Sequence, residues 1–388
     1  MKVLHTADWH LGKMFHGVNL IEDQRHALNQ LVEAVESERP DVVLVAGDVY
    51  DRAVPPTDAV DLLGEILNRI VGDLETSVVM VAGNHDSASR LHFAGSLLSR
   101  AGLHVFGRLD SRTELLSIKC ADGETLTICP MPFAEPAQVR EFGACEDVKC
   151  HDSAQAWWAS YYKQRLPKGA VSVAVGHSFV ANSKPSDSEK SLTIGGAEQV
   201  SVEHYSPFTY TALGHLHRPQ ACPGNERVRY SGSLLKYSLS EVDYQKGFTI
   251  VDISRGGAEV ECRQIDIKPL HDVRRVAGTL ESVIKMATHG NGPNNDYVYV
   301  QLDETVMPVE AVSQVRAHYP NMLEVTVKPR EIQNSLDANG ALQLQDINDY
   351  DLFSTFYKTI LGEEMVTGSD LDKALREVLE KMNRGEQS

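Results

Sequence analysis

The chain has 388 residues and a formal net charge of −17, from 37 basic and 54 acidic side chains. Its content of 42% hydrophobic and 23% charged residues is that of a globular protein and excludes a wholly disordered chain. No apolar run approaches the ~18 residues of a membrane span. The first residues lack the apolar stretch of a signal peptide, and six cysteines are too few for a disulfide scaffold. We therefore expect a cytoplasmic protein of about two or three domains.

The first hundred residues alternate between strand and helix patterns. Short apolar runs at Lys2–Thr6, Val42–Ala46 and 78–82 predict strands that are buried within a sheet. Between them, apolar residues recur at helical spacing in 20–36 and 57–71. This order predicts a mostly parallel sheet covered by helices.

The strands expected after residue 170 are less separated by helices, which predicts a second sheet and an α/β sandwich. They lie at 171–175, 210–213, 228–231, 248–253 and 259–265. Lys268-Pro269 then marks a boundary, so we expect a first domain over residues 1–268.

A smaller α+β pattern follows, which we interpret as a cap domain over residues 269–330. The tail, 331–388, is acidic and contains two amphipathic helical stretches, at 347–361 and 371–382. Two short helices cannot bury both apolar stripes against each other completely. The stripes therefore either dock on the cap or receive a partner.

Five polar clusters each follow an expected strand. They are Asp8-Trp9-His10, Gly47-Asp48-Val49-Tyr50-Asp51, Gly83-Asn84-His85-Asp86, Gly176-His177 and Gly214-His215-Leu216-His217. Functional groups of α/β sheets gather beyond the carboxyl ends of the strands, so we expect these clusters to meet at one edge.

The clusters contain seven side chains that can bind a metal through oxygen or nitrogen. They are Asp8, His10, Asp48, Asn84, His177, His215 and His217. Seven ligands are too many for one ion and suit two ions that share a bridge. Carboxylate with imidazole favours manganese, iron or zinc over calcium. Two such ions, about 3.5–4 Å apart, would clamp a phosphate for in-line attack by water.

The order D-x-H, G-D-x-x-D, G-N-H-D, G-H and G-H-x-H resembles the calcineurin-like metallophosphoesterase superfamily. Within it, the chain is most similar to the nuclease subunits of bacterial DNA-repair complexes, through segments 5–12, 46–51, 82–87, 129–133, 212–218 and 230–233. The resemblance implies a sandwich of two mixed β-sheets flanked by helices, a small α+β cap and a helical C-terminal tail. It also implies two Mn²⁺ per chain, with Fe, Zn or Mg as substitutes.

The resemblance also implies a role for each ligand. The first metal is held by Asp8, His10 and His217, the second by Asn84, His177 and His215, and Asp48 bridges them.

His85 has a different role in this scheme, because it protonates the leaving 3′-oxygen, as an imidazolium can near neutral pH. Asp51, three residues after Asp48, is our candidate for orienting His85. The alternative is that Asp51 only caps the following turn.

The implied activity is that of a manganese-dependent DNA nuclease. With an SMC-like ATPase partner it degrades double-stranded ends 3′→5′ using ATP, and it cuts single strands and hairpins internally. The C-terminal helices bind the ATPase, in a heterotetramer built on a homodimer of the nuclease. The chain lacks a G-x-x-x-x-G-K-[ST] loop and so is not itself that ATPase.

DNA contacts are predicted more weakly, from basic residues that lie near the ligands or in the cap. They are Arg218, Lys184, Lys190, Arg274 and Arg275. The net acidity disfavours non-specific adhesion to DNA, but bound metals add positive charge that the residue count misses.

The main alternative is a small-molecule phosphoesterase acting on nucleotides or cyclic nucleotides, which would share every metal ligand. The cap and tail argue for a macromolecular substrate, because a small-molecule enzyme does not need them. A protein phosphatase is disfavoured because that class continues the G-D-x-x-D motif with Arg-Gly, whereas here Arg52 is followed by Ala53. An inactive scaffold is disfavoured by the intact ligand set.

Overall fold

The computed structural model describes residues 1–110, 113–189, 198–289, 295–328, 350, 353–354, 357–358 and 364–383. The chain forms two compact units. The first comprises Met1–Arg275, Asn291–Tyr299 and Tyr319–Glu324, and the second comprises Val276–Gly290, Val300–His318 and Val325–Ser388. The division into domains at residues 268 and 330 stays a prediction.

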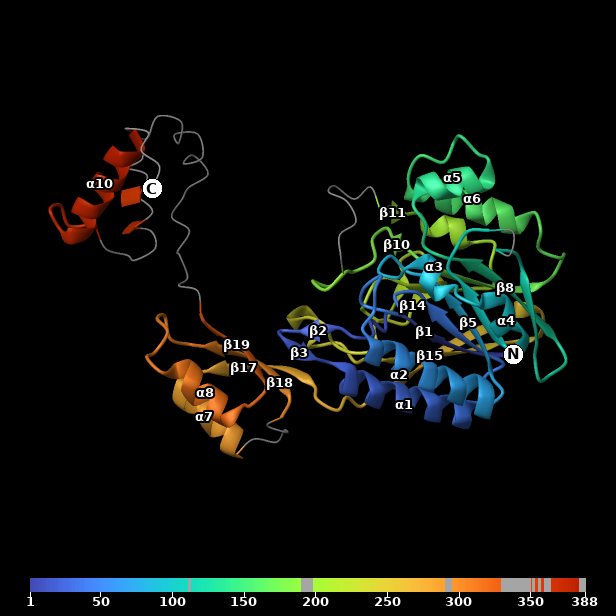
Figure 1. Cartoon of the computed structure of the whole chain (residues 1–388), viewed down its shortest axis with the longest axis horizontal. Coiled ribbons are helices and arrows are strands. Elements are labelled where there is room, and N and C mark those ends of the chain that lie inside the picture. Colours follow the sequence, from blue (N-terminus) through green and yellow to red (C-terminus); the bar gives the residue numbers. More distant parts are fainter. Residues whose placement is uncertain are drawn as a thin grey trace. The chain divides into compact units, whose positions relative to one another are not determined.

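The first unit is built on two six-stranded sheets, and the N-terminal strand β1 lies inside the first of them (Figure 1). Its order is β16 (Val260–Asp266), β15 (Gly247–Ile253), β1 (Lys2–Thr6), β4 (Val42–Ala46), β5 (Ser77–Val81) and β6 (Leu103–Phe106). Strands β1, β4, β5 and β6 run parallel, whereas β15 is antiparallel to both of its neighbours. The sheet is therefore mixed.

The second sheet is mixed in the same way. Its order is β13 (Gln220–Cys222), β14 (Asn225–Tyr230), β12 (Tyr210–Gly214), β9 (Val171–His177), β8 (Thr125–Met131) and β7 (Leu116–Lys119). The four central strands are parallel, and the edge strands β7 and β13 are antiparallel to their neighbours.

The side chains of β4 show how the layers stack, because alternate residues of a strand point to opposite faces. Val43 and Val45 join the core beneath α1 (Ile21–Glu38), while Val42 and Leu44 join the core between the two sheets. The helices α1 and α2 (Thr57–Leu67) lie along the outer face of the first sheet (Figure 1).

The outer face of the second sheet is covered by α6 (His151–Lys163), whose Trp158 and Tyr162 pack against Ala174 and Leu213. The order helix, sheet, sheet, helix confirms the expected sandwich of two mixed sheets flanked by helices. The helices of this unit are α2 (Thr57–Leu67), α3 (Ala88–Leu91), α4 (Gly95–Leu98), α5 (Pro136–Gly143) and α6 (His151–Lys163). The short strands are β2 (Met14–Phe15), β3 (Val18–Asn19), β10 (Phe179–Val180) and β11 (Gln199–Val200).

The C-terminal third contains a three-stranded sheet in the order β17 (Val273–Gly278), β18 (Tyr297–Leu302) and β19 (Met322–Val327). The helices α7 (Leu280–His289) and α8 (Ala311–His318) pack against each other. In the tail, α10 (Asp370–Asn383) begins after Ser369, whose Oγ accepts a hydrogen bond from the Asp372 N–H at 3.2 Å. Among the described residues, no helix is both long enough and apolar enough to cross a membrane.

Candidate metal centre

Two loops at the ends of β1 and β4 form the floor of the site. The main-chain N–H of Asp8 donates to the Gly47 carbonyl at 3.1 Å, and that of His10 donates to the Asp48 carbonyl at 2.9 Å. Asp8, His10 and Asp48 have φ values of 51°, 47° and 49°, in a region that non-glycine residues rarely adopt. The strain of these three residues is held by the surrounding loops, which is typical of functional sites.

Glycines beside the predicted ligands allow the loops to approach one another. A Cβ atom on Gly83 would collide with the main-chain nitrogen of Asp48, and one on Gly214 would collide with the Ala46 carbonyl. Gly83 and Gly214 are therefore required by close packing of the loops.

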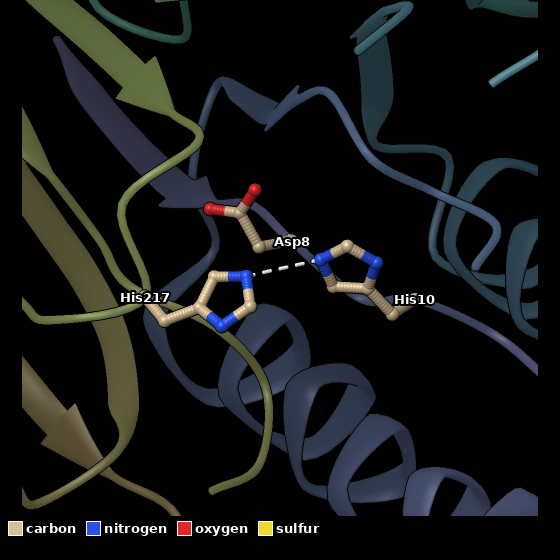
Figure 2. Close-up of side chains that lie close together, drawn as sticks. All are labelled: Asp8, His10 and His217. Carbon is tan, nitrogen blue, oxygen red and sulfur yellow. Dashed lines mark hydrogen bonds between the residues drawn. The ribbon is translucent and has the colours of Figure 1, made fainter. Parts of the chain in front are cut away.

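Asp8, His10 and His217 lie on the loops after β1 and β12, with ligand atoms within 4.8 Å of one another, and the two imidazole rings face each other (Figure 2). The Nε2 atoms of His10 and His217 are 3.0 Å apart. His217 Nδ1 lies 2.6 Å from Ser188 Oγ, which holds the ring with Nε2 facing His10. Two imidazole nitrogens that face each other beside a carboxylate are arranged to share a cation.

A second group forms around His177. Its Nδ1 donates to the Ala46 carbonyl at 2.9 Å, which leaves Nε2 as the ring nitrogen that faces the cluster. That Nε2 lies 2.9 Å from Asn84 Oδ1, and His215 Nδ1 lies 3.3 Å from the same oxygen.

Asp48 lies between the two groups. Its Oδ2 is 3.7 Å from His10 Nε2 and 3.4 Å from His177 Nε2. The structure thus brings all seven predicted ligand residues together, with Asp48 where a bridging carboxylate would lie. Their role as ligands remains a proposal.

The electrostatics of the cluster favour a bound cation. Asp8 is fully buried, and burial raises the pKa of its carboxyl to about 6. Burial acts on Asp48 in the same direction, but the His177 and His10 rings outweigh it and hold the pKa of Asp48 well below its usual range. The same carboxylates overcome the effect of burial on His177 and raise its pKa to about 9. Buried carboxylates mixed with imidazole and amide donors fit divalent manganese, iron or zinc.

His85 lies beside this cluster. Its main-chain N–H donates to Asp48 Oδ1 at 2.9 Å, and its ring Nε2 is 3.9 Å from Asp48 Oδ2. The ring Nδ1 donates to the main-chain carbonyl of Asp51 at 2.8 Å. The carboxylate of Asp51 forms an ion pair with Lys13 at 2.8 Å and lies 3.7 Å from His10 Nδ1. Asp51 therefore contacts His85 through its main chain, and an orienting role for its carboxylate stays a prediction.

The DNA-contact candidates differ in their availability. Arg218 stacks on the Tyr244 ring, with its guanidinium carbon 4.5 Å from the ring centroid. Arg274 is held in an ion pair with Asp296 at 2.6 Å. The others are Lys184 and Arg275, which are exposed, and Lys190, which lies outside the described residues.

No sequence pattern indicated Gln24, which fixes the loop carrying Asp8 and His10. This residue of α1 is fully buried. Its Nε2 donates to the carbonyls of Trp9 at 3.1 Å and His10 at 2.8 Å, while its Oε1 accepts from the Gly12 N–H at 3.0 Å.

Sequence reasoning also missed a buried ion pair behind His217. Lys246 Nζ lies 2.5 Å from Glu241 Oε2 and donates to the His217 carbonyl at 2.7 Å. Ser188 Oγ bridges Glu241 and His217 Nδ1. Burial opposes ionisation of Glu241, but Lys246 and His217 outweigh it and hold the pKa of Glu241 well below its usual range.

Replacing Glu241 with alanine is expected to lower the free energy of unfolding by about 3–5 kcal/mol, because Lys246 would be left buried without its partner. Urea unfolding of the purified chain measures this loss. Glu241→Leu combined with Lys246→Met should recover much of it, since both buried charges are then removed. A double variant as unstable as the single one would contradict this explanation.

Comparison with known proteins identifies the class. The family model described as calcineurin-like phosphoesterase matches residues 1–219, which is more than half of the chain, so the chain belongs to that family. A second model, described as the type 5 capsule protein repressor C-terminal domain, matches residues 269–360. The chain is 30% identical to the SbcD subunit of nuclease SbcCD from Staphylococcus saprophyticus, over 98% of this chain and 99% of the relative. Within the phosphoesterases it is therefore a member of the SbcD family.

Two solved structures are more distantly similar. They are TT1561 of Thermus thermophilus, at 13% identity, and a dimetal phosphatase from Danio rerio, at 12%. Each has a TM-score of 0.39 and covers 68% of this chain and 98% of its own. Similarity at this level adds nothing to the assignment.

Proposed function

We propose that the protein is a manganese-dependent DNA nuclease that hydrolyses phosphodiesters at the cluster around Asp48. The observation that carries this proposal is the convergence of seven oxygen and nitrogen donors on one site, six of them buried, with His85 beside it. The relative from Staphylococcus saprophyticus is a nuclease subunit by name. A nucleic-acid phosphodiester is therefore the substrate class that the site and the relative support together, and the substrate we propose is DNA.

The seven donors and His85 have different roles in the proposed reaction. The seven donors would hold two divalent cations, which when bound neutralise phosphate charge and make water a better nucleophile. His85 holds a proton for the leaving oxygen, and the Asp51 carbonyl fixes its ring through Nδ1. The contact from the His85 N–H to Asp48 Oδ1 ties this acid to the ligand cluster at a fixed position.

The test is cleavage of circular single-stranded DNA by the full chain with Mn²⁺. A circular substrate has no ends, so nicking demonstrates endonuclease activity that needs neither an end nor the partner. Turnover of a small phosphodiester or cyclic nucleotide without any DNA cleavage would instead favour the small-molecule phosphoesterase. Parallel assays of the metal-free chain with Mn²⁺, Fe²⁺, Zn²⁺ or Mg²⁺ would identify the metal that supports the highest rate.

We further propose that the chain acts in DNA repair with an SMC-like ATPase, SbcC, which would confer ATP-dependent 3′→5′ exonuclease activity on double strands. Helix α10 supports a docking role, because Leu371 and Val378 of its apolar stripe are 41% and 53% exposed. The first of the two predicted stretches, 347–361, falls mostly outside the described residues. A homodimer within a heterotetramer and a cytoplasmic location are further predictions.

Deleting residues 340–388 is expected to abolish co-purification with the ATPase while manganese-dependent nicking of circular DNA continues. Leu371→Asp with Val378→Asp should have the same effect, because it places charge on the apolar stripe. Lys373→Asp is the matched control, since Lys373 is exposed and lies on the opposite side of α10. Retention of the ATPase by the truncated chain would show that the tail is not the docking element.

A further inference from the structure

A pocket lies beside the metal cluster, on the side of His177 and His215. Both histidines line it, together with Phe133, Phe179 and Glu198. Because two predicted metal ligands form part of its wall, the part of a substrate next to the phosphate held at the metals would reach this pocket.

The walls of the pocket are aromatic. Phe133 packs edge-on against His177, with ring centroids 6.4 Å apart, and stacks on His151 at 5.8 Å. Phe179 lies 6.1 Å from His215. Phe133, Phe179 and His151 are only half-buried, so part of each ring remains free for contact. Such walls suit a flat aromatic guest, because base–aromatic stacking is favourable for every base.

Glu198 is the polar group of the pocket that indicates which hydrogen-bonding group the ligand carries. Its side chain is 6% exposed, and its Oε1 has no hydrogen-bond partner among the described residues. A buried carboxylate oxygen without a partner is costly, and a guest carrying an N–H group would satisfy it. Glu198 is also the only acidic residue among the described residues that line the pocket. It repels phosphate, so the pocket suits the uncharged part of a nucleotide.

We propose that this pocket binds an unstacked nucleobase of the strand whose phosphate lies at the metal cluster, with Glu198 accepting a hydrogen bond from the base. This inference rests on the proposed nuclease function. Adenine, cytosine and guanine carry an exocyclic amino group that projects from the ring edge toward an acceptor. Thymine has only a ring N–H between two carbonyls, whose oxygens repel a carboxylate. The pocket therefore favours the three amino-bearing bases over thymine.

The binding test uses 2-aminopurine, a fluorescent base that carries an amino group and loses fluorescence when it stacks. It is placed at successive positions of a short single strand. The full chain carrying His85→Gln binds these strands in Mg²⁺, so that cleavage does not interfere. We expect strong quenching at one position. Phe133→Leu should remove that quenching, and Glu198→Gln should weaken it. Glu203→Gln, an exposed residue of the same segment, should leave it unchanged.

The cleavage test compares strands with cytosine or thymine at the quenched position. The native chain should show a kcat/KM ratio favouring cytosine by on the order of tenfold, and Glu198→Gln should bring the ratio close to one. Quenching and base preference that are unaffected in both variants, at unchanged thermal stability, would overturn the pocket assignment. Uniform fluorescence at every position would overturn it too. Failure of the native chain to cleave any DNA would instead overturn the proposed function. The 2-aminopurine quenching would still test the pocket assignment in that case, because it measures binding and not cleavage.

Discussion

Asp48→Asn is expected to lower manganese-dependent DNA cleavage by roughly 10³-fold or more. Asp48 Oδ2 lies within 3.7 Å of His10 Nε2 and 3.4 Å of His177 Nε2, so its charge serves both halves of the cluster. Removing that charge weakens both predicted metal sites at once. Asparagine also tolerates the positive φ of this position better than most residues do, so the loop should keep its shape.

The measurement combines nicking of circular single-stranded DNA with titration calorimetry of Mn²⁺ on the metal-free chain. The native chain should bind two Mn²⁺, and the variant should bind them far more weakly. Asp61→Asn is the matched control, because it removes the same charge from an exposed position on α2. Full metal binding with lost cleavage would mean that Asp48 acts in catalysis without bridging the metals.

The sequence predicted the elements that are buried on both faces most accurately. Strands β1 and β4 have the bounds expected from their continuous apolar runs, and β5 is displaced by one residue. Strands β6 and β7 were missed because they have only four residues each, and polar side chains interrupt their apolar pattern. Strand β8 was missed because it contains Pro130, which argues against a strand when only the sequence is considered.

In the candidate site, some residues can be predicted from short sequence clusters, whereas others come together only in the folded chain. The seven predicted donors could be selected from the sequence because each lies at or just after the end of a strand, in a short cluster whose residue types indicate metal binding. Glu241 and Lys246 could not be found, because a buried glutamate and lysine have no local pattern and meet His217 only through the fold. The contact from Asp51 to His85 uses a main-chain carbonyl, which any residue would supply. The residue type at position 51 therefore could not indicate this main-chain contact.

His85→Gln is expected to lower DNA cleavage by about 10²–10⁴-fold while both Mn²⁺ ions stay bound, because His85 supplies a proton rather than a ligand atom. Glutamine is close to histidine in size and can still donate a hydrogen bond to the Asp51 carbonyl, but it has no proton to give to a leaving oxygen. The main-chain contact of residue 85 with Asp48 is independent of the side chain.

The choice of substrate separates an acid from a structural residue. The leaving group in DNA hydrolysis is an alkoxide, which needs a proton. The leaving group from bis(p-nitrophenyl) phosphate is p-nitrophenolate, which is stable without one. A residue that acts as the acid should therefore matter for DNA and be nearly dispensable for the nitrophenyl ester. Equal losses on both substrates, or release of one Mn²⁺ from the variant, would assign His85 to the architecture of the metal site. A selective loss on DNA would identify it as the acid, since no general weakening of metal binding could spare one phosphodiester and not the other.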